Sequence, residues 1–211
     1  MTPTPRGRRR PAPLDARKQP VQRRSTATVV AILEAAARIL EQRGFSGYTT
    51  NAIAERAGVS VGSLYQYFPN RDALTAALIE RESAPLMAAL EEAGAASSCE
   101  AALCGLIRAS VAHQMQRPVL ARLLDFEEER LPLGERDARI GDRIHATLVR
   151  AFGMPDAPRL DDPSTAAYDV FAIVRGMVDA AGARGETDAL ALEARATRAV
   201  VGYLWRSETP R

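Results

Sequence analysis

The chain has 211 residues, of which 46% are apolar, and it carries a formal net charge of +2. The apolar fraction is sufficient for a hydrophobic core and too high for a wholly disordered chain. No run of 18 apolar residues occurs, and no apolar stretch follows the basic N-terminus. We therefore expect neither a membrane span nor a secretory signal. The only cysteines, Cys99 and Cys104, match no zinc or redox spacing, so we expect two reduced thiols in a cytoplasmic protein.

The charge is distributed unevenly along the chain. Residues 1–24 contain eight basic residues and one acidic residue, a net charge of +7, with several prolines and almost no large apolar residues. Such a segment cannot repay the entropy cost of ordering, so we expect a basic disordered tail. Residues 25–82 carry −1 and residues 83–211 carry −4. A basic tail on a mildly acidic body indicates a polyanionic partner, although a solubilising tail would have the same composition.

Helical periodicity begins near Thr26. Apolar residues recur at spacings of three and four as far as Leu40, and Gly44 is expected to end this first helix. Further on, Asn70 follows the helix breaker Pro69 and can cap another helix that continues toward Ser83.

Between these helices the sequence predicts a helix-turn-helix. Two short helices, 50–57 with Thr49 as N-cap and 61–67 with Ser60 as N-cap, are joined by a three-residue turn. The turn begins at Gly58, a residue suited to a positive φ. In such units the first helix crosses the DNA backbone and the second lies in the major groove. The helices must cross through small or apolar residues, and the sequence supplies Ile53, Ala54, Ala57, Val59 and Leu64.

The rest of the chain also reads as helices. We place them near residues 84–94, 100–116, 119–130, 136–152, 163–184 and 187–206, with breaks at Pro118, at Pro132 and over 153–163. No stretch shows sustained strand alternation, and no internal repeat is present. The sequence therefore predicts an all-α protein.

Residues 30–79 resemble the DNA-binding domain of the TetR family of transcriptional regulators. The strongest matches are RGF at 43–45, TTNAIAERAGVS at 49–60 and SLYQYFPNRDAL at 63–74. The remaining two thirds resemble the family only in being helical. After the basic disordered tail at 1–24, which composition indicates, the resemblance implies a three-helix helix-turn-helix domain at 25–83 and a C-terminal helical domain at 84–211 for effector binding and dimerisation.

The resemblance also assigns residues to the DNA interface. Thr50 matches a phosphate-binding hydroxyl, and Arg71 matches a basic residue that grips phosphate at the start of the fourth helix. The tyrosines match phosphate-binding positions, although ordinary core aromatics would fit the same pattern. The full candidate set is Thr50, Asn51, Val61, Gly62, Ser63, Tyr65, Gln66, Tyr67 and Arg71. Because this domain has a net charge of −1, we expect the arginine-rich tail to assist it by lying along the narrow minor groove.

The last two predicted helices are apolar around most of their circumference, so they need burial on more than one side. In proteins that this chain resembles, they pair with their symmetry mates in a four-helix bundle. A deep intramolecular core is the alternative, and we expect both. The candidate dimer residues are Phe171, Val174, Val178, Val201 and Leu204.

The resemblance further implies a small-molecule cavity among the helices between about 100 and 180. The candidate lining residues, which would serve equally well as plain core, are Leu106, Met115, Leu123, Phe126, Phe152 and Phe171. The acidic cluster at 127–129 alternates with Arg122 and Arg130, which is typical of a solvated helix face. A ligand-binding carboxylate in that cluster stays an open alternative.

No motif indicates an enzyme. His113 and His145 are the only histidines, and neither a metal-binding HExxH nor a phosphate-binding glycine loop occurs. We expect no catalytic site, no metal and no cofactor.

The sequence thus predicts a dimeric, ligand-responsive repressor that binds a palindromic double-stranded operator, with half-sites about 34–36 Å apart. Activation instead of repression stays open, as do the effector, the operator and the regulated genes. The rival hypothesis is a sequence-indifferent DNA-binding protein that relies on its tail, and a specificity ratio would separate the two. A helical enzyme is a further rival with no motif to support it.

Overall fold

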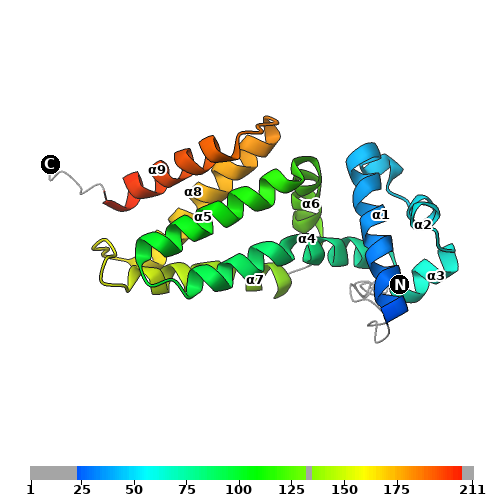
Figure 1. Cartoon of the computed structure of the whole chain (residues 1–211), viewed down its shortest axis with the longest axis horizontal. Helices are drawn as coiled ribbons and strands as arrows, with labels where there is room; N and C mark the ends of the chain where they lie inside the picture. The colour runs from blue at the N-terminus through cyan, green and yellow to red at the C-terminus, as the bar shows by residue number, and fades with distance from the viewer. Residues whose placement is uncertain (1–22, 132–134, 206–211) are drawn as a thin grey trace, which may run out of the picture.

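The computed structural model describes residues 23–131 and 135–205, which form nine α-helices and no strand (Figure 1). The helices, in chain order, are α1 Arg23–Gly47, α2 Thr50–Ala57, α3 Val61–Tyr67, α4 Arg71–Gly94, α5 Cys99–Gln116, α6 Pro118–Arg130, α7 Glu135–Phe152, α8 Pro163–Ala183 and α9 Ala189–Trp205. The predicted all-α class is confirmed. The predicted tail falls outside the described residues, apart from Arg23 and Arg24, which open α1.

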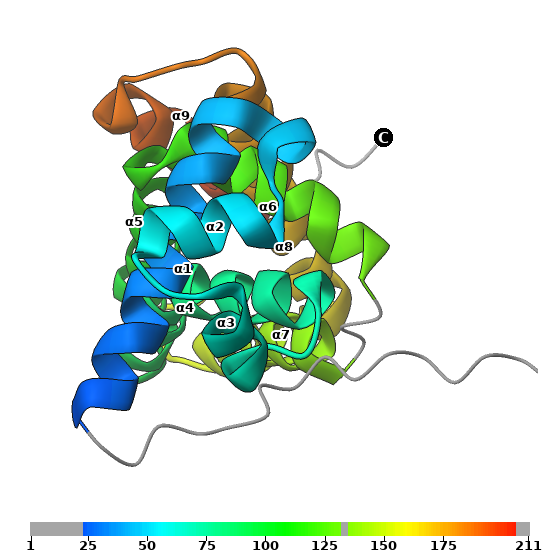
Figure 2. The ribbon, with the colours of Figure 1, turned by 90° about the vertical axis from the view of Figure 1, so that its right-hand side faces the viewer.

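The molecule is elongated, with a small head at one end. The head consists of α1, α2, α3 and the first half of α4. The body consists of the second half of α4 with α5, α7, α8 and α9, and α6 lies at the junction beside α1 (Figure 1). Viewed onto the head, α2 and α3 lie in front of the other helices (Figure 2). The helix-turn-helix is therefore presented to solvent at the far end of the molecule.

Local sequence signals explain the helix boundaries in the head. Thr49, Ser60 and Asn70 have extended backbones, and their side-chain oxygens accept hydrogen bonds from backbone N–H groups in the first turn of each helix. These three predicted N-caps are confirmed. Gly44 has a φ of 59° and interrupts α1, as expected, although a further turn continues to Gly47.

One predicted boundary is wrong. Helices expected at 70–83 and 84–94 form the single helix α4, with Pro85 inside it. Proline in a helix interior removes one hydrogen bond, and its ring clashes with the carbonyl four residues earlier, which together cost about 3 kcal/mol. Packing on both sides offsets this cost, because Ile79 is buried in the head and Leu90 in the body. The expected limit between the two helical domains at 83/84 thus lies within a continuous helix.

The described residues form two hydrophobic cores, and α6 belongs to the head core. The head core is built mainly from α1 to α4, and the body core from α4, α5, α7, α8 and α9. Leu120 and Leu124 of α6, together with Leu131 just after it, are nearly inaccessible and pack in the head core. Movement of α6 relative to the head would expose these side chains to water.

Arg117, at the N-terminal end of α6, is held by carboxylates of the head and of α4. Its guanidinium donates two hydrogen bonds to Glu41, of 2.8 and 2.7 Å, and one of 3.3 Å to Glu34. The Glu82 carboxylate lies 3.6 Å away. Hydrogen bonding to Glu41 raises the pKa of Arg117, so the guanidinium stays charged. A cation at a helix N-terminus opposes the helix dipole, and these carboxylates compensate for it.

Arg130, at the other end of α6, forms a second cluster. It contacts Glu127 at 2.6 Å and Asp72, in the first turn of α4, at 2.7 Å. Glu127 is only 3% exposed, so the expected fully solvated acidic face is wrong at this residue. The face turns inward because Arg130 neutralises the buried carboxylate. Ion pairs thus attach both ends of α6 to the head.

We predict that Arg117→Met lowers the free energy of unfolding by about 2 kcal/mol, because it leaves partly buried carboxylates without their main partner. Urea denaturation would measure the change. The matched control is Arg108→Met, which breaks the Arg108–Glu193 pair, where the arginine side chain is 70% exposed. That substitution should cost no more than about 0.5 kcal/mol. Equal destabilisation of the two variants would contradict this account of the α6 attachment.

Candidate DNA-binding surface and effector cavity

The helix-turn-helix has the geometry that the sequence predicts. Ile53 of α2 and Leu64 of α3 are completely buried where the two helices meet. Gly58 has φ 68° and ψ 29°, and its N–H group caps α2 by donating to the carbonyls of Ala54 and Glu55. A left-handed glycine therefore turns the chain sharply between the two helices.

Fewer residues of α3 face outward than the candidate set for DNA contact contains. Gly62, Tyr65 and Gln66 are exposed, whereas Val61 and Tyr67 are half-buried and pack against the head core. Ser63 is also half-buried, and its hydroxyl lies 2.8 Å from the hydroxyl of Ser60. The accessible edge of α3 therefore centres on Gly62 and Gln66, and whether any of these residues contacts DNA stays a prediction.

Polar candidates from α2 and α4 surround this edge. The hydroxyls of Thr50 and Tyr65 lie 3.4 Å apart, which links the start of α2 to α3. Asn51 is exposed beside Thr50. Arg71 is exposed at the first position of α4.

Although residues 25–82 have a net charge of −1, several described arginines of the head have no carboxylate partner. Among the described residues, Arg43, Arg56 and Arg71 form no ion pair with a carboxylate, whereas Arg38 and Arg81 pair with Glu34. The negative charge of the head is thus partly neutralised on the side that faces α6. Arg43, Arg56 and Arg71 are therefore not neutralised by a carboxylate of the described residues.

A cavity of about 140 Å³ lies in the body, between α4, α5, α6, α7 and α8. Its lining residues are Ser83, Leu86, Ser110, His113, Gln114, Asp125, Glu128, Ile144, Phe171, Val174, Arg175, Val178 and Asp179. Of the expected lining residues, Phe171 lies in this wall, and Leu106 lines a narrow apolar slot that shares Phe171 and Ile144 with the cavity.

The other four candidate lining residues are placed elsewhere. Phe152 is buried in the body core, Met115 packs against that core, and Leu123 packs against the head core. Phe126 is 61% exposed, with its ring centroid 5.8 Å from that of Phe45 in the head. These positions share one reason: helical periodicity identifies apolar residues but not the helix against which each will pack.

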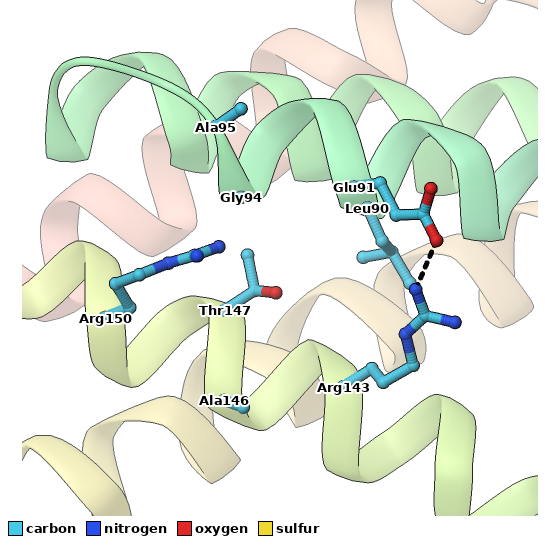
Figure 3. Close-up of a pocket in the computed structure, with 8 residues that line it drawn as sticks. All are labelled: Leu90, Glu91, Gly94, Ala95, Arg143, Ala146, Thr147 and Arg150. Carbon is cyan, nitrogen blue, oxygen red and sulfur yellow. Dashed lines mark hydrogen bonds and ion pairs between the residues drawn. The ribbon is translucent and has the colours of Figure 1, made fainter.

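A larger groove of about 620 Å³ runs between α4 and α7 (Figure 3). Arg143 and Glu91 pair across it at 2.5 Å, and the guanidinium of Arg150 lies over Gly94. Its polar side chains, including Thr147, all remain at least partly exposed. The groove is therefore a less suitable effector site than the cavity, where polar groups converge on an apolar wall.

The expected dimer residues divide into two groups. Val174, Val178 and Leu204 are 5–7% exposed and belong to the body core, in line with the expected intramolecular core, and whether they also meet a second copy stays a prediction. Val201 is 45% exposed, and Phe171 is half-buried in the cavity wall. The periodic apolar pattern of α8 and α9 is satisfied largely within one chain. The face that stays open has mostly small and apolar side chains: Tyr168, Ala172, Gly176, Ala180, Ala183, Leu190, Ala194, Val201 and Trp205.

No group of three or more His, Cys, Asp or Glu side chains in the described part of the chain is arranged to hold a metal ion. No helix in the described ranges is both long enough and apolar enough to cross a lipid bilayer.

The exposed helix-turn-helix on a separate helical body defines the class of protein, a helical DNA-binding regulator. Comparison with known families agrees. The family described as bacterial regulatory proteins, tetR family, matches residues 32–78, and the tetracyclin repressor-like C-terminal domain matches residues 98–204. The chain belongs to the TetR family of bacterial transcriptional regulators.

Individual relatives support this assignment. An uncharacterised HTH-type transcriptional regulator of Mycobacterium tuberculosis is 34% identical over 143 residues, which cover 68% of this chain and 69% of the relative. A TetR-family regulator from Rhodococcus sp. has a TM-score of 0.68 at 24% identity, covering 85% of this chain and 99% of that one. The regulator FadR from Bacillus subtilis, solved with stearoyl-CoA, has a TM-score of 0.70 at 17% identity, with coverages of 85% and 99%. At these identities the two structures show a shared fold.

We predict opposite stability effects for alanine at two glycines of the helix-turn-helix. Gly58→Ala should destabilise the protein by about 1 kcal/mol, because φ at this position is left-handed. Gly62→Ala should stabilise it by about 0.5–1 kcal/mol, because Gly62 lies within α3 and an added Cβ would be 3.8 Å from its nearest neighbour, the Ser60 hydroxyl. Urea midpoints would measure both. A stabilised Gly58→Ala protein would contradict the turn geometry.

Proposed function

We propose that the chain is a ligand-responsive repressor that acts as a homodimer on a palindromic, double-stranded DNA operator. The observation that carries this proposal is the exposed edge of α3 at the far end of the head (Figure 2). Arg71, at the first position of α4, follows α3 closely and pairs with no carboxylate among the described residues. The proposed DNA partner would place the protein in the bacterial cytoplasm.

Direct reading of bases rests on α3. Gln66 is exposed on this helix, and glutamine can bind adenine through two hydrogen bonds in the major groove. Gly62 has no side chain to hold the backbone away from the base edges. The half-buried residues of α3, which are Val61, Ser63 and Tyr67, would contribute mainly at the margin of the contact. Asn51 and Thr50 would meet the adjoining backbone or bases.

Phosphate binding rests on Arg71 and on the tail. Arg71 at the start of α4 combines a guanidinium with the free N–H groups of a helix N-terminus, an arrangement that favours phosphate. The hydroxyls of Thr50, Tyr65 and Tyr67 would add hydrogen bonds from α2 and α3. Residues 1–24 would add +7 per subunit along the minor groove.

Dimerisation would use the open face of α8 and α9. Small residues such as Ala172 and Gly176 let helices approach closely, and the larger Val201 and Trp205 supply apolar area. Two-fold symmetry would bring this face against its copy and direct two α3 helices toward successive major grooves.

Ligand response would use the cavity in the body. Among proteins that share the fold, FadR was solved with stearoyl-CoA, and NalD is described as the secondary repressor of the MexAB-OprM multidrug efflux pump. These descriptions support a ligand-binding body and a repressing action for this chain. A ligand changes DNA affinity only if it binds the DNA-free conformation more tightly than the DNA-bound one.

We predict that Arg71→Ala weakens binding to all DNA sequences to a similar extent, because phosphate contacts position a protein without reading bases. The slope of log K against log salt should fall by about 0.9 for each phosphate that the variant no longer neutralises. Gln66→Ala should instead change which half-site is preferred. Binding titrations at several salt concentrations would measure both effects. The control is Arg38→Ala, whose guanidinium pairs with Glu34 and should leave DNA affinity unchanged. Unchanged affinity for Arg71→Ala at physiological salt would exclude its proposed role.

We predict that Val201→Glu yields monomers at micromolar concentration, because the dimer would bury two unpaired carboxylates. Sedimentation velocity would report the mass. Val119→Glu is the matched control, since Val119 of α6 is 47% exposed and lies outside α8 and α9. A dimer that survives Val201→Glu, or a wild-type chain that is monomeric, would refute the proposed interface.

A further inference from the structure

The cavity between α4 and α8 has a compact apolar wall. The apolar residues that line it are Leu86, Ile144, Phe171, Val174 and Val178. A volume of about 140 Å³ is close to that of an engineered cavity that binds benzene, about 150 Å³. The wall therefore suits an apolar body about as large as one six-membered ring, and the polar lining residues determine which group that body can carry.

The charged side chains of the lining already have partners. Asp125 and Glu128 of α6 each interact with another residue. The Asp179 carboxylate lies 3.6 Å from the guanidinium of Arg175 on the same helix. A charged ligand group would therefore meet no unpaired charge among these described lining residues, and its burial would cost free energy. The lining thus favours a ligand that is neutral at pH 7.

Two serine hydroxyls of the lining have already used their donors. The Ser83 hydroxyl donates to the carbonyl of Ile79 at 2.9 Å. The Ser110 hydroxyl donates to the carbonyl of Leu106, also at 2.9 Å. Each oxygen therefore keeps only acceptor capacity for a ligand. A ligand with an N–H group is favoured over one that has acceptors alone.

His113 is neutral and is held by α4. Burial lowers the pKa of its imidazole, while the charge of Glu82 and a backbone hydrogen bond with Glu82 act in the opposite direction. Since the net pKa shift is downward, the ring is neutral at pH 7. The bond with the Glu82 backbone uses one of its two ring nitrogens, so His113 adds neither a charge nor a wholly unpaired group to the lining.

Gln114 is the polar lining residue that lacks a partner. It is 3% exposed, and its side-chain amide forms no hydrogen bond with another described residue. Every fully enclosed side-chain nitrogen or oxygen in the described ranges has a partner. Both the carbonyl oxygen and the nitrogen of this amide must therefore reach open space, and the space that Gln114 lines is the cavity. A largely buried amide costs free energy until a partner is supplied.

Gly182 of α8 fixes the position of this amide. A Cβ built on Gly182 would lie 2.2 Å from the Nε2 atom of Gln114, so the amide packs directly against the glycine. A carboxamide held in this way presents an acceptor and a donor side by side. Glutamine uses the same edge to bind adenine through two hydrogen bonds. Both atoms are satisfied at once by a group that has an N–H and a C=O on one side, and an amide is such a group.

We propose that this cavity binds a neutral amide, a carboxamide or lactam on an apolar body about the size of one ring. The ligand N–H would donate to the Gln114 carbonyl oxygen, and the ligand C=O would accept from the Gln114 nitrogen. The apolar body would pack against Phe171 and Ile144. This inference rests on the proposed function, for which it names the chemical class of the effector.

Four probes with the same planar shape test the inference on the full-length protein. Benzamide, acetophenone, benzamidinium and benzoate differ only in the group that the phenyl ring carries. Benzamide has a donor beside an acceptor, acetophenone and benzoate have acceptors alone, and benzamidinium has donors alone. Isothermal titration calorimetry at pH 7 and fixed ionic strength would measure their affinities. We expect benzamide to bind at least about tenfold more tightly than each other probe, because the others leave an atom of the buried amide unpaired.

Variants locate the binding through the ratio of benzamide to acetophenone affinity. Gln114→Met keeps the length of the side chain but removes both polar atoms, so it should bring this ratio close to one. Gly182→Ala should lower the ratio, because the added Cβ displaces the Gln114 amide. The matched control is Gln116→Met, which alters an exposed glutamine of α5 outside the cavity and should leave the ratio unchanged. Thermal unfolding of each variant would confirm that it folds, and two different positions keep the test valid if one variant does not.

The outcomes separate this inference from the proposed function. Equal binding of all four probes, tighter binding of any probe other than benzamide, no binding, or a preference for benzamide that persists in Gln114→Met would overturn the amide site. Operator binding would stand in each case. If benzamide binds as expected but leaves operator affinity unchanged at saturation, the amide site stands and the ligand-responsive part of the proposed function fails.

Discussion

The attachment of α6 to the head is the constraint on which the rest of the structure depends. Arg117 at one end of α6 contacts Glu41, and Arg130 at the other end contacts Asp72. Between these ion pairs, side chains of α6 lie in the head core. Although α6 follows α5 of the body in sequence, it is therefore packed as part of the head. The orientation of the helix-turn-helix relative to the body depends on these few contacts and on α4, which runs continuously from one to the other.

The opposite side of α6 faces the body cavity, which brings the two halves of the proposed mechanism together. Asp125 and Glu128 line that cavity. His113 of α5 lines it as well, and also lines a small hollow beside Glu82 and Arg117. A ligand in the cavity would therefore contact α6, the helix that orients the head. It would also contact His113, which lies beside the ion-pair cluster of Arg117. Energetic coupling between DNA and ligand requires only that the two conformations of this junction differ in their affinity for the ligand.

Local chemistry explains which parts of this structure the sequence can predict. The boundaries of α2 and α3 follow from Thr49, Ser60 and Gly58, whose caps and turn depend on neighbours within a few residues. The secondary structure of the body helices follows from periodicity in the same way, because each helix needs an apolar face.

Other features cannot be predicted from the sequence, because they depend on contacts between helices that lie far apart along the chain. Pro85 suggests a helix start, but packing on both sides retains one helix. Val174 and Val201 are equally apolar in sequence, yet one faces the core and the other solvent. Likewise, no periodicity indicates that Gln114 lines a cavity or that Glu127 is buried.

The central claim is sequence-specific binding of DNA by this chain, and the most direct measurement is a ratio of two affinities. Selection from a random duplex library would provide the preferred site, and the full-length protein would then be titrated with that site and with a scrambled duplex of equal length at physiological salt. We predict a two-fold symmetric site bound at least about a thousandfold more tightly than the scrambled duplex. A ratio near one, with binding that depends on salt alone, would contradict the account and identify a protein that coats DNA without regard to sequence.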